Sequence, residues 1–190
     1  MTAIPFYIDL KSPFSYVAAH QGLALSRAGK ANFDWLPFTL DIAGRVGGAG
    51  WQQRVRYVYR DVRRFATPLG LTIRGPKEVY DSTVAQIGLL FAKQAGVHEA
   101  YIERAFALFF QRELAPDDSA AITALLKECD CDVAGFPAFL EGEGAQALTA
   151  IQEEAEAAGV FGVPSLIVGD ELFWGQDRLD MALAQAGVTA

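Results

Sequence analysis

The sequence is poor in cysteine: Cys129 and Cys131 are the only two among 190 residues. Their spacing does not match the Cys-x-x-Cys pattern of dithiol redox enzymes, and it does not support an easy disulfide between them. So few cysteines fit a protein of a reducing compartment, and we predict a cytoplasmic location. Both thiols are interpreted as structural.

Histidine and basic charge are also scarce. The two histidines, His20 and His98, lie far apart without a metal-ligand spacing, so no metal site is predicted. The net charge of −7 argues against nucleic acid or an anionic membrane as a partner, since both require a basic surface. No run approaches the roughly 18 apolar residues of a membrane span, and residues 1–9 do not resemble a leader segment, so neither is expected.

Apolar residues are plentiful, at 52%, which is enough to bury the core of one domain with an elaboration. The apolar run 4–9 predicts a buried strand that ends shortly before a helix. Ser12 has the position of the helix N-cap and Pro13 that of the first helical residue, and helical spacing continues toward Gly29. Residues 33–38 alternate as a second strand, parallel to the first because a helix separates them.

The pattern changes after the second strand. A glycine-rich loop at 41–50 precedes a long stretch with helical periodicity and almost no strand signal. Helices are expected at 51–69, 81–96, 98–114, 117–129 and 144–159. Strand character returns at 164–168 and 172–174, and these two runs are expected to form a β-hairpin. A last helix is expected at 177–185.

The order of these elements predicts the fold class. We expect an α/β protein with a thioredoxin-like β-α-β / β-β-α domain and an all-helical insertion. Residues 1–41 and 160–190 would form the thioredoxin-like domain, and residues 42–159 the inserted helical domain. No repeat or flexible linker is visible, so the inserted helices should pack against the sheet.

Three short motifs point to one family. Asp-Leu-Lys-Ser-Pro-Phe-Ser-Tyr spans 9–16, Phe-Gly-Val-Pro-Ser spans 161–165, and Phe-Trp-Gly-Gln-Asp-Arg-Leu spans 173–179. At these separations the motifs resemble the 2-hydroxychromene-2-carboxylate isomerases, glutathione-dependent relatives of the kappa-class glutathione transferases in the DsbA-like thioredoxin superfamily. The resemblance covers nearly the whole chain.

This resemblance implies a glutathione site. The catalytic serine of the family corresponds to Ser12, and its cis-proline corresponds to Pro164. The backbone of Val163 would pair with the cysteinyl part of glutathione, and Gln176 with Asp177 would receive the γ-glutamyl end. Gln176 departs from the usual Asn or Ser. The glycine-rich loop and the following helix lack the Asn and Lys that relatives place near the cofactor, so no residue there is assigned.

The chemistry of these residue types agrees with that role. A thiol attacks as the thiolate, and unpaired N–H groups at a helix start lower the pKa of a thiol below its usual value of about 8.5. A serine there can donate a hydrogen bond to a bound sulfur without forming the mixed disulfide that a cysteine would form. Asp177 can accept the ammonium group of glutathione, and N–H groups around Gln176 can meet its α-carboxylate.

Plainer interpretations of the same residues stay open. Ser12 fits an ordinary N-cap, Pro164 an ordinary strand-start proline and Asp177 an ordinary helix-start acid. Four arginines recur at helical spacing, namely Arg56, Arg60, Arg63 and Arg64. We expect a solvated helix face there, with a substrate carboxylate as the alternative. Trp174 is the aromatic residue we favour as a lining of the substrate pocket.

The predicted function is a glutathione-dependent isomerase acting on a conjugated, aromatic-pathway acid, and the resemblance implies a homodimer. Two alternatives stay open: a kappa-like transferase that releases a glutathione conjugate, and a non-catalytic binding or chaperone-like module on the same fold. A transferase would consume glutathione, and a binding module would be insensitive to Ser12→Ala. A dithiol oxidoreductase is not expected, because no cysteine lies near the first helix start, so insulin reduction should fail.

Overall fold

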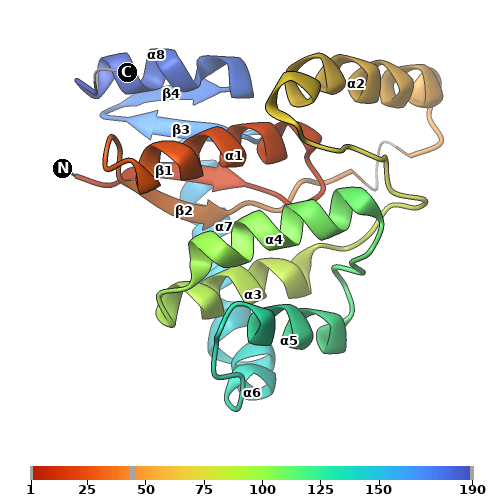
Figure 1. Cartoon of the computed structure of the whole chain (residues 1–190), viewed down its shortest axis with the longest axis vertical. Helices are drawn as coiled ribbons and strands as arrows, with labels where there is room; N and C mark the ends of the chain where they lie inside the picture. Colours follow the sequence, from red (N-terminus) through yellow and green to blue (C-terminus); the bar gives the residue numbers. More distant parts are fainter. Residues whose placement is uncertain (1, 43–45, 189–190) are drawn as a thin grey trace.

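A computed structural model describes residues 2–42 and 46–188 of the chain. Residues 43–45, within the predicted glycine-rich loop, lie outside the described residues. The chain folds around a four-stranded sheet with the strand order β2-β1-β3-β4 (Figure 1). The strands are β1 (Ile4–Ile8), β2 (Phe33–Pro37), β3 (Ser165–Val168) and β4 (Glu171–Trp174).

The two halves of the sheet have the predicted connections. Strands β1 and β2 are parallel, with Phe6 opposite Trp35, and helix α1 (Pro13–Arg27) crosses between them. Strand β3 runs antiparallel to β1, where Tyr7 lies opposite Ser165, and it forms a hairpin with β4. The β-α-β / β-β-α order predicted from the sequence is therefore confirmed.

Helices dominate the stretch between the two halves. They are α2 (Trp51–Ala66), α3 (Thr83–Gln94), α4 (His98–Gln111), α5 (Ser119–Glu128), α6 (Phe136–Glu141) and α7 (Glu143–Ala157), with a 3₁₀ turn at Thr67–Leu69. All but α6 were predicted from helical spacing. Helix α6 has only 6 residues, too few for an apolar period to repeat. No helix in the described ranges is long and apolar enough to cross a membrane.

The end of the chain differs from the predicted single helix over 177–185. A 3₁₀ turn covers Gln176–Arg178, and helix α8 (Leu179–Gln185) follows it. Gly175, with a φ of +117°, precedes the turn and accepts a backbone hydrogen bond of 3.1 Å from three residues further on. That bond tightens the chain into 3₁₀ geometry. Asp177 therefore lies in this turn and not in the first turn of the α-helix.

Both faces of the sheet are buried, and successive strand residues serve opposite faces. Phe6 and Ile8 join a large apolar core with α1, α3 and α4, whereas Tyr7 packs on the other side with Ala155 of α7. Figure 1 shows α1 in front of the strands and α7 behind them. Tyr16 of α1 stacks on Phe106 of α4 with ring centroids 5.4 Å apart, so the inserted helices share the core of the sheet.

Candidate active site

Ser12 lies where the turn after β1 enters α1. Its backbone is extended (φ −88°, ψ 113°), and its Oγ accepts a hydrogen bond of 3.1 Å from the N–H of Ser15. Pro13 occupies the first helical position, where a missing N–H costs no helical hydrogen bond. The predicted N-cap is confirmed. Because the cap is formed through the oxygen, the single proton of the hydroxyl is left for another partner.

The Ser12 hydroxyl contacts the segment around Pro164, which is the second predicted part of the site. The Ser12 hydroxyl donates to the carbonyl oxygen of Val163 at 3.3 Å, so the two motifs meet although 151 residues separate them. Hydrogen bonds between two oxygens usually measure about 2.5–3.0 Å, so this one is weak and can exchange for a stronger acceptor. Ser12 is only 5% exposed, so a partner that replaces the carbonyl is held in a largely water-free position.

The turn around Pro164 presents the backbone of Val163. The Val163–Pro164 peptide bond is cis, as the family resemblance implied. The hydroxyl of Ser165 donates to the carbonyl oxygen of Gly162 at 2.7 Å, and the N–H of Gly175 donates to that of Pro164 at 2.9 Å. These bonds fix the turn on both sides. The N–H of Val163 has no hydrogen-bond partner among the described residues, so it is available to a ligand.

Gln176 and Asp177 follow directly on this turn, because the Gly175 N–H is bonded to Pro164. Gln176 is buried, whereas the side chain of Asp177 is 54% exposed and pairs with Arg178 at 2.9 Å. An exposed pair of this kind contributes about 0–1 kcal/mol to stability. The Asp177 carboxylate can therefore leave Arg178 for a cationic group of a ligand at little cost.

Asp9 is a component of the site that the sequence reasoning missed. Its carboxylate is fully buried, and its two oxygens accept hydrogen bonds from the N–H groups of Lys11 (2.9 Å) and Leu40 (2.8 Å). Burial raises the pKa of the Asp9 carboxyl, and the nearby Lys11 ammonium and the hydrogen bonds to the carboxylate oppose that rise. The sequence did contain a sign of this role, because Asp9 is an acidic residue directly after an otherwise apolar strand. A buried carboxylate at such a place must accept hydrogen bonds from neighbouring donors.

A second serine lies one helical turn below Ser12. Ser12 and Ser15 have the spacing of a Cys-x-x-Cys redox pair, but both are hydroxyls. Ser15 is fully buried, and its Oγ has no hydrogen-bond partner among the described residues. Cys129 and Cys131, by contrast, are free and buried at the end of α5, where burial raises the pKa of both thiols. Neither is placed or activated for thiol chemistry at this corner.

The arginines of α2 lie on a solvated face, as expected. Their side chains are exposed, the Nε of Arg63 donates to the carbonyl oxygen of Ile73 at 3.1 Å, and Arg64 pairs with Asp61 at 2.7 Å. Trp174 is 53% exposed and packs edge-to-face against Phe161 with ring centroids 4.9 Å apart. It lines neither of the two cavities described next.

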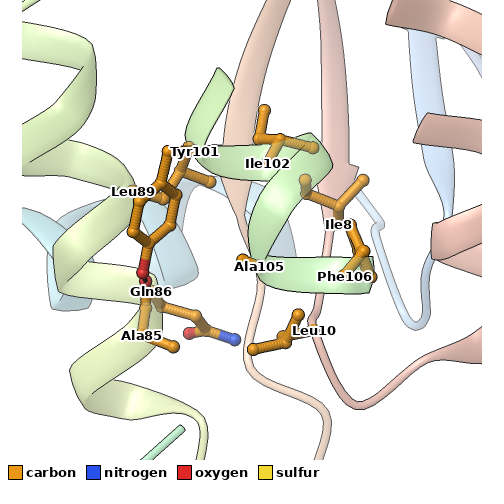
Figure 2. Close-up of a pocket in the computed structure, with 9 residues that line it drawn as sticks. All are labelled: Ile8, Leu10, Ala85, Gln86, Leu89, Tyr101, Ile102, Ala105 and Phe106. Atoms are coloured by element: carbon orange, nitrogen blue, oxygen red, sulfur yellow. Dashed lines mark hydrogen bonds between the residues drawn. The ribbon is translucent and has the colours of Figure 1, made fainter. Parts of the chain in front are cut away.

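Ser12 lines neither of two cavities in the described part of the chain. Figure 2 shows the first, of about 30 Å³, between the end of β1 and helices α3 and α4, with Leu10 and Phe106 in its wall. The second, of about 180 Å³, lies between α1 and α4 and is lined by Tyr16 and His20 among others. Neither includes Val163. No cluster of three metal-ligating side chains occurs within the described ranges.

A comparison with family models finds that the DSBA-like thioredoxin domain matches residues 3–186. Curated relatives from two Pseudomonas strains are among those named 2-hydroxychromene-2-carboxylate isomerase. The one from Pseudomonas putida is 28% identical, with 97% of this chain and 94% of the relative covered. The one from Pseudomonas sp. (strain C18) is 29% identical, with 94% of this chain and 87% of the relative covered.

A solved structure agrees with these relatives. The selenomethionine structure of a 2-hydroxychromene-2-carboxylate isomerase superposes with a TM-score of 0.85 at 27% identity, and it covers 98% of this chain and 95% of its own. The match therefore extends over the sheet, the inserted helices and both corners of the candidate site.

Proposed function

The chain belongs to the DSBA-like thioredoxin domain family, and from this premise we propose that it is a glutathione-dependent isomerase of the 2-hydroxychromene-2-carboxylate type. The named relatives support the reaction class. The observation that carries the proposal is the contact between Ser12 and Val163, where a proton donor at a helix start adjoins a peptide edge with a free N–H. The absence of cysteine at positions 12 and 15 argues against a dithiol oxidoreductase.

The site fits a thiol-bearing peptide. The Val163 N–H is unpartnered among the described residues, and its carbonyl holds only a 3.3 Å bond, so both groups can pair with an extended ligand. A peptide N–H of glutathione would replace the Ser12 hydroxyl at that carbonyl. The freed hydroxyl would then donate to the sulfur, and a charge-assisted bond of this type is worth about 1.5–3 kcal/mol.

The charged end of glutathione would lie on the other side of the turn. Asp177 would receive its ammonium group after leaving Arg178, and backbone N–H groups around Gln176 would receive its α-carboxylate. When bound, glutathione would supply a thiolate able to add reversibly to the conjugated double bond of the acid and so to permit rotation about that bond. Ser12 and the start of α1 hold the thiolate charge, while the burial of Ser12 excludes water.

We also propose a cellular location and an oligomeric state for the enzyme. We place it in the cytoplasm, which the free and buried Cys129 and Cys131 support. We also expect a homodimer, on the family resemblance. Gel filtration with light scattering would test that state, and a monomeric mass would remove this part.

Calorimetric titration with glutathione tests the binding site. Ser12→Ala and Asp177→Ala should each weaken the affinity about tenfold or more, because each loses a charge-assisted hydrogen bond. Ser26→Ala, at the other end of α1, and Asp180→Ala, on α8, are the matched controls and should bind as the wild type does. Unchanged affinity in both site variants would contradict the proposal.

Turnover separates isomerase from transferase. With a hydroxychromene carboxylate as substrate, catalytic amounts of glutathione should support many turnovers without loss of the free thiol. With a chloronitrobenzene electrophile, little conjugate should accumulate. Stoichiometric loss of glutathione in the first assay would favour the transferase, and no glutathione-dependent reaction at all would favour the binding module.

A further inference from the structure

The backbone N–H and carbonyl of Leu40 are both hydrogen-bonded to residues of the turn before α1. Its N–H donates to Oδ2 of Asp9 at 2.8 Å, and its carbonyl oxygen accepts from Nζ of Lys11 at 2.9 Å. Leu40 follows β2, on the neighbouring strand of the sheet. We call Asp9, Lys11 and the Leu40 backbone the Asp9 clamp, because together they tie the chain after β2 to the chain before Ser12.

The same two residues also fix the main chain that leads into Ser12. The N–H of Lys11 donates to Oδ1 of Asp9, and the N–H of Ser12 donates to the backbone carbonyl of Asp9, each at 2.9 Å. The ammonium group of Lys11 lies 3.6 Å from Oδ2 of Asp9, and the two side chains are 9% and 0% exposed. With its carboxylate and its carbonyl both engaged, Asp9 allows the Ser12 backbone little freedom.

A second set of bonds anchors the clamp on α3. The Ser82 side chain is near enough to the Asp9 carboxyl to lower its pKa, and its hydroxyl oxygen accepts from Nε2 of Gln86 at 3.1 Å. The hydroxyl of Thr39 donates to Oε1 of Gln86 at 2.6 Å, so the residue before Leu40 is held by the same network. The Asp9 carboxylate therefore ties the β1–α1 turn to the segment after β2, and Gln86 of α3 holds that same segment through Thr39.

Stability alone is a poor explanation for such an arrangement. Removing two charges from water is costly, and replacing a buried ion pair by well-packed apolar residues is often neutral or stabilising. What the pair supplies in return is a defined position for the backbone it holds. That position decides where the Ser12 hydroxyl points, and hydrogen bonds weaken steeply when donor and acceptor are misaligned.

We propose that Asp9 and Lys11 are positioning residues, which hold the Ser12 hydroxyl in line with the sulfur of bound glutathione. The inference rests on the proposed function, since it assigns the clamp a role in glutathione binding at that same site. Neither residue contacts the reacting atoms in this proposal. Their contribution is to the strength of the hydrogen bond from Ser12, and hence to the acidity of the bound thiol.

Asp9→Asn should shift the pKa of the bound thiol in one direction if Asp9 positions Ser12, and in the opposite direction if Asp9 acts only through its charge. Both carboxylate oxygens of Asp9 accept hydrogen bonds from N–H donors, which is the pattern of the ionised form. Removing a negative charge near a thiolate would, by charge alone, lower the pKa of that thiol. A misplaced Ser12 hydroxyl would raise it. The carboxylate of Asp81 also lies near Lys11 and is left unchanged in this comparison.

The test is a pH titration of the thiolate absorbance of glutathione bound to the full chain. Asp9→Asn should raise the pKa of the bound thiol by about 1, the loss of much of one charge-assisted hydrogen bond. Ser82→Ala, which removes the hydroxyl beside the Asp9 carboxylate without a change of charge, should also raise the pKa of the bound thiol. Asp34→Asn, a charge removal on β2 away from the clamp, should leave it unchanged.

The outcomes distinguish this inference from the proposed function. If the wild type lowers the pKa of bound glutathione but Asp9→Asn leaves it equal or lower still, the positioning role is overturned while the proposed function stands. If the wild type itself does not bind glutathione, the proposed function fails and this inference fails with it. Should Asp9→Asn not fold, the neutral Ser82→Ala variant decides by the same criterion.

Discussion

The hydroxyl of Ser12 donates to the carbonyl oxygen of Val163 across 3.3 Å, while its own oxygen caps helix α1 by accepting from Ser15. The capping role and the donor role therefore use different atoms of one hydroxyl and do not compete. A ligand thiolate can accept the hydrogen bond from the hydroxyl while the cap stays in place. This arrangement lets the structural and the catalytic contributions of Ser12 be separated by substitution.

Ser12→Ala should lower the free energy of unfolding by about 1 kcal/mol, because the cap is lost, and should also abolish most glutathione-dependent turnover. Ser12→Asp should keep the cap and hence the stability, since aspartate is an equally good N-cap. It should still lose turnover, because an ionised carboxylate has no proton to donate and repels a thiolate. Urea denaturation and the isomerase assay provide the two readouts, and an active Ser12→Asp enzyme would contradict this account.

Replacing both serines by cysteine should convert the site to dithiol chemistry. Positions 12 and 15 are three residues apart at a helix start, the spacing of a redox Cys-x-x-Cys pair. Because the Ser15 Oγ has no partner among the described residues, a thiol there breaks no hydrogen bond. Ser12→Cys/Ser15→Cys should gain insulin reduction with dithiothreitol, and the wild type should have none. Ser12→Cys alone should form a mixed disulfide with glutathione, visible as an added mass.

The sequence was most informative where local chemistry decides the structure. Ser12 before Pro13 specified the helix start, and the alternating run around Trp35 specified the strand parallel to β1. The family resemblance implied that Ser12 and Val163 serve one site, but the hydrogen bond between them was not predicted, because nothing local to either residue specifies a partner 151 positions away.

The parts that were missed have no local or periodic signal in the sequence. Helix α6 is too short to produce a period. Asp177 was placed at the start of an α-helix, because a 3₁₀ turn after a glycine has no distinct sequence pattern. The Asp9 clamp joins residues 9 and 40, and only the folded sheet brings the Leu40 peptide to the carboxylate. Secondary-structure propensity and residue spacing indicate which residues interact along the chain, but they do not indicate which residues meet across neighbouring strands.

Close packing inside the inserted helices predicts a sharp effect at Gly88 of α3. A Cβ atom there would lie 2.5 Å from the hydroxyl oxygen of Tyr101 and 2.7 Å from a methyl group of Ile122. Gly88→Ala should therefore cost about 1–3 kcal/mol of unfolding free energy by overpacking. Gly135→Ala is the matched control, since its nearest neighbour would be Phe91 at 3.9 Å. Equal stability of the two variants in urea would contradict the packing described.

The start of α3 should contribute a pH-dependent part of the stability. The Asp81 carboxylate accepts hydrogen bonds from the N–H (2.9 Å) and the hydroxyl (2.6 Å) of Thr83, and these bonds lower the pKa of Asp81. A lowered pKa means that the unfolded chain binds the proton more readily, so the contribution is present above about pH 4 and is lost as the pH falls through the folded pKa. Asp81→Ala should cost about 1 kcal/mol at pH 7.

That cost should shrink as the solution is acidified. As the pH falls through the lowered pKa of Asp81, the wild-type carboxyl becomes protonated, so wild type and Asp81→Ala should approach the same unfolding free energy. Urea denaturation at a series of pH values measures the difference directly. A difference that stays constant from neutral to acid pH would show that the Asp81 carboxylate does not act through its charge.

The most direct test of the central claim is a crystal structure of the wild-type chain with glutathione bound. We predict the sulfur within hydrogen-bonding distance of the Ser12 Oγ, and the cysteinyl backbone paired with the N–H and carbonyl of Val163. Glutathione bound elsewhere, or bound here with its sulfur directed away from Ser12, would contradict the account.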